Sequence, residues 1–209
     1  MKKIINMILL VVFITSAAAN AQKIYKYDSV PGDPLKVRIY TLDNGMKAYL
    51  TVYKDAPRIQ TAIAVKTGSK NDPSDNTGLS HYLEHMMFKG SDEFGTKDFV
   101  HEKPLLDKIE YQFEVYKKTT DTIQRKKIYH EIDSLSGVAS KFAIANEYDK
   151  LLATIGAKGT NAFTSFEQTV FVNEIPSNKV KPWLEIEFER FKDPVFRLFH
   201  TELETVYEE

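Results

Sequence analysis

The sequence predicts a mixed α and β fold, with sheet segments near its beginning and its end and helices between them. Asn44-Gly45 lies between two β-rich runs, and this pair favours a tight hairpin because both residues accept a positive φ. From about residue 98 to residue 155, apolar side chains recur at helical spacing and charged residues are dense. Strand-like runs then return at residues 160–166 and 169–175.

The first third of the chain is expected to form three strands and a helix. Residues 37–42 and 46–53 are the arms of the predicted hairpin, and residues 59–65 form a third strand. A loop rich in Gly, Ser, Asn, Asp and Pro follows. The helix is expected over about residues 77–89, where apolar side chains form one stripe. Thr77 or Asp75 can cap its start and Gly90 can end it.

The middle of the chain predicts an α-helical hairpin, inserted at about residues 103–145. Pro104 is expected in the first turn of its first helix, and Asp121 can cap the second. A block so dense in charge is most simply a solvated packing element. Beyond the late strands, Ser177 can cap a further helix, and a last helix is expected from near Thr201.

Composition excludes several classes of protein. The chain has 209 residues, enough for one ordinary domain or two small ones, and 43% apolar with 27% charged residues excludes wholesale disorder. A formal net charge of −1 gives no electrostatic footprint for nucleic acid, so no nucleic-acid partner is expected. Without any Cys, a disulfide scaffold, a thiolate zinc site and a Cys nucleophile are excluded. A transition-metal site would need His and carboxylate ligands.

The first 21 residues read as a secretory signal peptide. Lys2 and Lys3 precede an apolar run at residues 7–14, and Ala19-Asn20-Ala21 is a cleavage signal, so the mature chain would begin after Ala21. The alternative is a membrane anchor, for which the apolar run is too short. We therefore expect an exported protein, periplasmic or secreted, without a stable membrane anchor, and a single mature domain at residues 22–209.

The residues most suggestive of chemistry are His81, Glu84 and His85. His81 and His85 are four residues apart in the predicted helix, so both imidazoles project from one face, as two nitrogen ligands of Zn²⁺ require. Glu84 can reach a water bound to the same metal. The pattern H-x-x-E-H reverses the H-E-x-x-H of other zinc peptidases. The alternative is a surface helix carrying two His, or a His satisfied by a neighbouring carboxylate.

The flanking residues resemble a known family. The run at residues 78–91 closely resembles the active-site helix of the pitrilysin/insulysin (inverzincin) family of zinc metallopeptidases, which includes mitochondrial processing peptidases. Residues 42–46 resemble the family's first hairpin, and residues 161–165 its substrate-facing edge strand. The inserted helical hairpin is similar to that of longer members from bacterial envelopes. This resemblance implies an α+β fold, a mostly antiparallel β-sheet covered by helices.

The resemblance also implies roles around a metal. His81, His85 and Glu209 would bind one Zn²⁺ per chain, and Glu84 would be the general base that activates the zinc-bound water. Glu202 would orient a ligand His. The spacing of Glu202 and Glu209 around Val206 fits the family's downstream E-x-x-x-V-x-x-E pattern. A solvated acidic face is the alternative for this Glu-rich end, where two more carboxylates are available, Glu204 and Glu208.

The implied function is that of an exported zinc metalloendopeptidase acting on a peptide or unfolded protein. Asn161 and Ala162 would bind the substrate backbone. Family members close a chamber with a second homologous domain or subunit, and the sequence ends at the implied third ligand, Glu209. We therefore expect the N-terminal catalytic domain, truncated at its C-terminus. The alternative is a catalytically incomplete fragment or a peptide-binding partner subunit. The other His residues are expected to be surface or structural: His101, His130 and His200.

Overall fold

The computed structural model describes residues 24–208. The predicted signal peptide and Glu209 lie outside the described residues. Contacts divide the chain into two compact units, residues 1–56 and residues 57–209, and each is described by itself. No helix among the described residues has both the length and the apolar character needed to cross a membrane.

The first unit contains a three-stranded antiparallel sheet. Its strands are β1 (Tyr27–Asp28), β2 (Arg38–Thr41) and β3 (Lys47–Leu50), in that order. The turn between β2 and β3 is the hairpin predicted at Asn44-Gly45. Gly45 has a φ of 85°, and the Asn44 side chain accepts a hydrogen bond from the Met46 amide at 3.1 Å. β3 ends at Leu50, three residues before the predicted end of this strand at residue 53.

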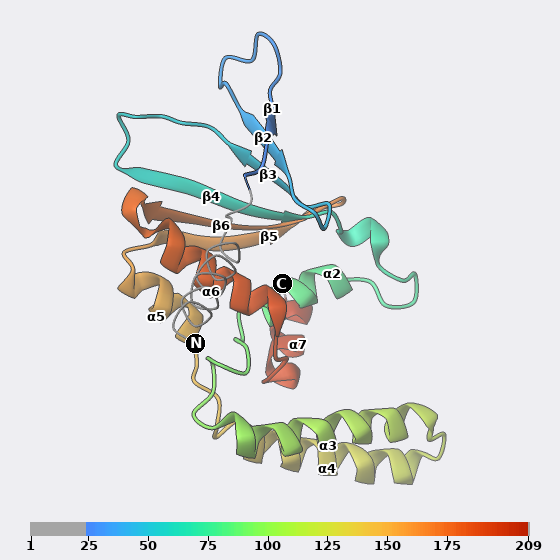
Figure 1. Cartoon of the computed structure of the whole chain (residues 1–209). Coiled ribbons are helices and arrows are strands. Elements are labelled where there is room, and N and C mark those ends of the chain that lie inside the picture. The colour runs from blue at the N-terminus through green and yellow to red at the C-terminus, as the bar shows by residue number, and fades with distance from the viewer. Residues whose placement is uncertain (1–23, 209) are drawn as a thin grey trace, which may run out of the picture. The chain divides into compact units, whose positions relative to one another are not determined.

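The second unit is built on another antiparallel sheet, in the order β4-β6-β5. β4 is Arg58–Val65, β5 is Lys158–Thr164 and β6 is Thr169–Pro176, and all three match predicted runs. β6 is the central strand, which explains why its side chains are the most buried of the three. Figure 1 shows three helices on one side of this sheet: α2 (Leu79–Met86), α5 (Glu147–Thr154) and α6 (Val180–Lys192).

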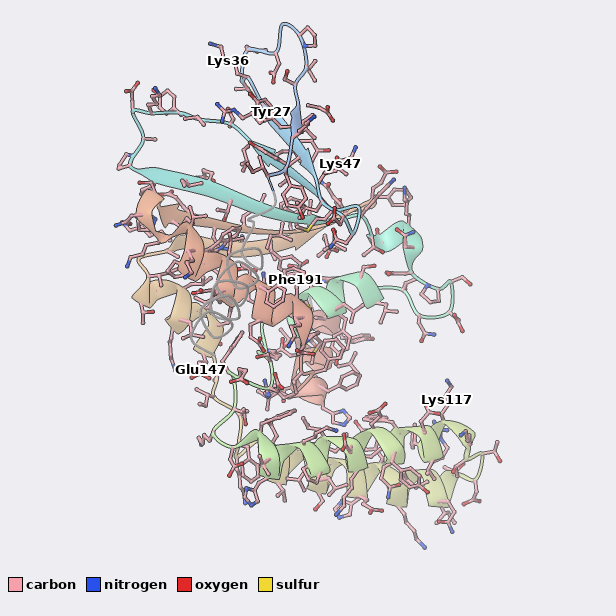
Figure 2. All side chains as sticks on the ribbon, viewed as in Figure 1. Tyr27, Lys36, Lys47, Lys117, Glu147 and Phe191 are labelled. Atoms are coloured by element: carbon pink, nitrogen blue, oxygen red, sulfur yellow. The ribbon has the colours of Figure 1, made fainter. Side chains whose placement is uncertain are left out.

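The core of this unit lies between the sheet and these helices. Phe94, Tyr148, Leu152, Ile175 and Trp183 form one buried cluster. Burial raises the pKa of the Tyr148 phenol, whose hydroxyl donates a hydrogen bond to Glu187 at 2.6 Å. Glu147, at the start of α5, accepts a hydrogen bond from the amide of Gly95 and so ties the loop that contains Gly95 to the core layer (Figure 2). The expected α+β class, with an antiparallel sheet covered by helices, is confirmed.

The expected helical hairpin is present as α3 (Phe99–Lys118) and α4 (Thr122–Ala139). It has its own small core of Ile109, Ile132 and Ala139, and Lys117 lies at the closed end of the hairpin, next to the turn from α3 into α4 (Figure 2). Asp121 caps α4 as predicted. The expected position of Pro104 is wrong, because Asp98 caps α3 by accepting a hydrogen bond from the His101 amide, so the helix begins earlier and Pro104 lies inside it.

Candidate active site

The short helix α2 (Leu79–Met86) carries the H-x-x-E-H pattern. The expected caps, Thr77 and Asp75, are not used. Gly78 takes the N-cap position with a φ of 86°, and this left-handed turn lets the Asp72 carboxylate accept from the amides of Gly78 and Ser80, each at 2.9 Å. The Ser80 hydroxyl donates to the same carboxylate at 2.6 Å, and these bonds lower the pKa of Asp72. The start of α2 is therefore fixed by the loop before it.

The last helix, α7 (Phe199–Glu208), packs against α2. Tyr82 is buried in this contact, and its hydroxyl donates a hydrogen bond to the Phe199 carbonyl at 2.8 Å. Burial and the neighbouring Glu202 carboxylate raise the pKa of Tyr82, so the hydroxyl remains a donor. This contact sets the position of α7 relative to the two histidines.

His81 and His85 converge as their spacing predicts. Their Nε2 atoms lie 3.2 Å apart, and their ring planes are inclined at 80°. In a tetrahedral zinc site with Zn–N bonds of about 2.0–2.1 Å, two ring nitrogens lie about 3.3–3.4 Å apart. The donor atoms of this pair therefore have the separation that one zinc ion requires.

Glu202 lies beside His85, on the side of the ring away from His81. Its Oε2 is 3.3 Å from Nδ1 of His85, and its Oε1 accepts a hydrogen bond from the ammonium group of Lys89. A proton on Nδ1 shared with this carboxylate leaves the Nε2 lone pair facing His81. Nothing in the sequence reasoning identified Lys89 as a partner of this carboxylate.

Glu84 is buried on the side of α2 that faces the sheet. Its side chain extends to β5, where Oε2 accepts a hydrogen bond from the Thr164 hydroxyl at 2.6 Å. Thr164 was not among the predicted site residues. It does lie in the segment at residues 161–165 on which the family resemblance partly rests.

One hollow of about 610 Å³ joins these groups. Asn161 and Ala162 line it from β5, which among the described residues pairs with β6 alone and so leaves one edge without a strand partner. The structure thus brings together six of the seven predicted site residues, and the seventh, Glu209, lies outside the described residues. The six that line this hollow are His81, Glu84, His85, Asn161, Ala162 and Glu202.

The remaining His residues lie elsewhere. His101 pairs with Asp98 at 2.6 Å on an exposed surface, and His130 is exposed. His200 packs against the ring of Phe113 at 5.2 Å between centroids. These three side chains thus have the surface or packing roles expected of them.

A group of three carboxylates also lies outside the hollow. The ligand atoms of Asp92, Glu189 and Asp193 lie within 4.8 Å of one another. Asp92 and Asp193 are exposed, and the Lys192 ammonium group pairs with Asp193. A lysine at this position compensates part of the acidic charge, so we assign no metal site to this group.

Comparison with known sequences finds a match to a protein family in the part of the chain that contains α2. Residues 49–123 match the family described as Insulinase (Peptidase family M16). The insulin-degrading enzyme homolog of Dictyostelium discoideum is 34% identical over 71 residues, which are 34% of this chain and 7% of that protein. Protease 3 of Escherichia coli strain K12 is 42% identical over 57 residues, 27% of this chain and 6% of that protein. The matched segments are therefore a small part of these relatives' lengths.

Comparison with solved structures extends the likeness of the fold. A protease from Helicobacter pylori superposes with a TM-score of 0.54 and 20% identity, covering 89% of this chain and 31% of that one. The first half of the periplasmic protease PqqL from Escherichia coli gives 0.53 and 17%, covering 87% of this chain and 30% of that one. At these identities the likeness supports the fold, and each neighbour is a longer chain.

Proposed function

We infer that this chain is a member of the insulinase (M16) peptidase family, an inference supported by the match of residues 49–123 to that family. From this premise we propose that it is the catalytic domain of a zinc-dependent endopeptidase. The observation that carries the proposal is the convergence of His81 and His85, with Nε2 atoms 3.2 Å apart, beside the buried Glu84 carboxylate. A surface helix that merely carries two histidines has no need of a buried carboxylate next to them.

The proposed metal site consists of His81, His85 and Glu209, with one Zn²⁺ per chain. Two imidazole nitrogens and a carboxylate are a ligand set that zinc peptidases use, and it leaves a fourth position open. Glu202 would hold the ring of His85 in place through Nδ1. A zinc ion bound there would act as a Lewis acid that makes water more acidic and polarises a peptide carbonyl.

Glu84 is the proposed general base. Its carboxylate would take a proton from the attacking water and later give it to the leaving amine of the cleaved peptide. Burial suits this role because bulk water does not compete for the carboxylate. Its place one residue before His85 keeps it next to the histidine pair in any conformation that preserves α2.

The proposed substrate is a peptide or unfolded protein bound in extended form. β5 borders the hollow, and the edge of β5 that has no strand partner within residues 24–208 can add a substrate strand through main-chain hydrogen bonds. Asn161 and Ala162 would contact the substrate backbone there. Recognition of main chain predicts broad side-chain tolerance and a preference for unfolded segments.

We also propose that a second homologous domain or subunit completes the chamber, and that residues 1–21 direct export to the periplasm or beyond. The structural neighbours are about three times longer than the part that this chain matches, which supports a further domain. Without that domain, a catalytically incomplete fragment or a peptide-binding subunit is the alternative. A peptidase assay with and without the candidate partner separates these cases.

The test is a comparison of unaltered protein with Glu84→Gln. After dialysis against metal-free buffer, about one zinc per chain is expected in both proteins. Hydrolysis of a quenched fluorescent peptide should vanish in the variant, whereas zinc and peptide binding should persist. Activity that survives the substitution would refute Glu84 as the base, and loss of zinc from the unaltered protein would refute the proposed ligand set.

A further inference from the structure

The Glu84 side chain is held at its tip by a residue from the sheet. Glu84 is 7% exposed, and its Oε2 accepts a hydrogen bond from Thr164 Oγ1 at 2.6 Å. Thr164 is the last residue of β5, on the strand face that carries the less exposed side chains. A bond this short to a carboxylate restricts the rotation of the carboxyl group.

Thr164 is itself held by a second hydroxyl. Its Oγ1 is 3.2 Å from Oγ1 of Thr169, its partner in the β5–β6 register. Thr169 is 5% exposed, and its hydroxyl donates to the carbonyl of Thr67 at 3.1 Å. A chain of hydroxyl contacts thus runs from the Glu84 carboxylate to a backbone carbonyl in the loop after β4.

The far end of this chain is fixed by backbone contacts. The loop after β4 lies so close to the β5–β6 turn that a Cβ on Gly68 would stand 2.3 Å from the Ser165 carbonyl oxygen. The amides of Ser69 and Lys70 donate to the carbonyls of Ser165 and Phe166, each at 3.0 Å. The Thr67 carbonyl therefore has a set position relative to the two threonines.

We propose that Thr164 is a positioning residue that holds the Glu84 carboxylate in its working orientation, with Thr169 and the Thr67 carbonyl fixing Thr164. The inference rests on the proposed function, in which Glu84 is the general base. If the Glu84 side chain occupied several rotamers, its carboxylate would be out of reach of the attacking water for part of the time. The rate of hydrolysis, rather than substrate binding, is therefore the quantity that depends on Thr164.

A hydroxyl suits this position because it can both donate and accept. Thr164 donates its single proton to Glu84, so it accepts across the contact with Thr169, whose proton lies between Thr164 Oγ1 and the Thr67 carbonyl. A Val at position 164 could neither donate to Glu84 nor accept from Thr169.

The kinetic test uses Thr164→Val, Thr164→Ser and the control Thr160→Val in the complete protein. Thr160 lies four residues earlier on the same face of β5 and donates to Asn173 at 3.0 Å, away from Glu84. We expect Thr164→Val to lower kcat roughly 10- to 100-fold with little change in KM, since a hydrogen bond to a charged group is lost. Thr164→Ser should restore kcat to within about threefold, and Thr160→Val should change it less than about twofold. Unchanged kcat in Thr164→Val, or an equal loss in Thr160→Val, would overturn the proposal.

A structural test decides the same point without activity. Crystal structures of the unaltered protein and Thr164→Val should show one Glu84 rotamer in the first and a displaced or divided carboxylate in the second. Zinc content should be equal in both. A Glu84 carboxylate that keeps its place in Thr164→Val would overturn the positioning role. Should the unaltered protein fail to cleave peptides, the proposed function fails, while these crystals still decide whether Thr164 holds Glu84.

Discussion

Replacing Arg197 with Met should strongly destabilise the fold, although Arg197 lies outside any helix or strand. Its side chain is 2% exposed and ends in a buried network. Nε and Nη2 donate to the two oxygens of Glu102 at 2.9 and 3.2 Å. Nη1 donates to the carbonyl of Lys89 at 2.7 Å, and Nη2 to that of Ser91 at 2.8 Å. Arg197 therefore joins the loop after α2 to the first turn of α3.

The magnitude follows from what the substitution leaves behind. Glu102 is 0% exposed, so removal of the guanidinium group leaves a buried carboxylate without its cation. Breaking such a pair costs about 3–5 kcal/mol, a large share of the roughly 5–15 kcal/mol that stabilises a typical domain. The double variant Arg197→Met with Glu102→Leu also removes the stranded charge. It should therefore be more stable than the single variant by about 2 kcal/mol.

Urea unfolding followed by tryptophan fluorescence measures both variants, because Trp183 is the single tryptophan and lies in the core cluster. A chelator in every sample keeps metal binding from contributing to stability. The control is Lys103→Met, which removes an exposed ion pair to Asp107 on α3 and should change stability by less than about 1 kcal/mol. A loss below about 1 kcal/mol in Arg197→Met, or a double variant no more stable than the single one, would refute the reasoning.

Three further outcomes are expected. Glu202→Gln should weaken zinc binding roughly 10- to 100-fold in a chelator competition, because the carboxylate beside His85 Nδ1 is lost; unchanged affinity would contradict its orienting role. Gly68→Ala should lower the urea midpoint, since its Cβ would stand 2.3 Å from a backbone oxygen, whereas Gly137→Ala, in α4 with open space around it, should be neutral or stabilising. The depressed pKa of Asp72 means that its contribution to stability is complete above its ordinary pKa of 3.8 and is lost as pH falls through the lower folded-state value. Unaltered protein should thus lose its stability advantage over Asp72→Asn on acidification, and an advantage that grows as pH falls would reverse the expected sign.

The features that sequence predicted well depend on residues close together along the chain. Asn44-Gly45 forms its turn with its immediate neighbours, and an i, i+4 spacing on a helix sets the meeting of His81 and His85. Such geometry needs no knowledge of the rest of the fold. The strands β4, β5 and β6 were recognised for the same reason, from short β-rich runs between turn signals.

The features that sequence reasoning missed join residues that are far apart. Thr164 meets Glu84 across 80 positions, and Arg197 meets Glu102 across 95. The spacing of apolar residues along the sequence does not indicate which strand end will lie next to which helix. The residue that fixes the start of α2 was also not predicted, although it lies close by in the sequence. Asp72, rather than Asp75 or Thr77, accepts the amide hydrogen bonds there because the backbone makes a left-handed turn at Gly78.

Contacts between residues far apart in the sequence also determine how α2 holds its histidine pair. A helix of eight residues is too short to be stable by itself, so its geometry must come from its contacts. Asp72 fixes its start, Tyr82 and Lys89 join it to α7, and Glu84 joins it to β5. Two of these four groups, Tyr82 and Glu84, point from the helix in directions other than that of the histidine pair. The geometry of the His81–His85 pair therefore depends on α7 and on the sheet, and disturbing either should alter the proposed metal binding or proton transfer without changing a proposed ligand.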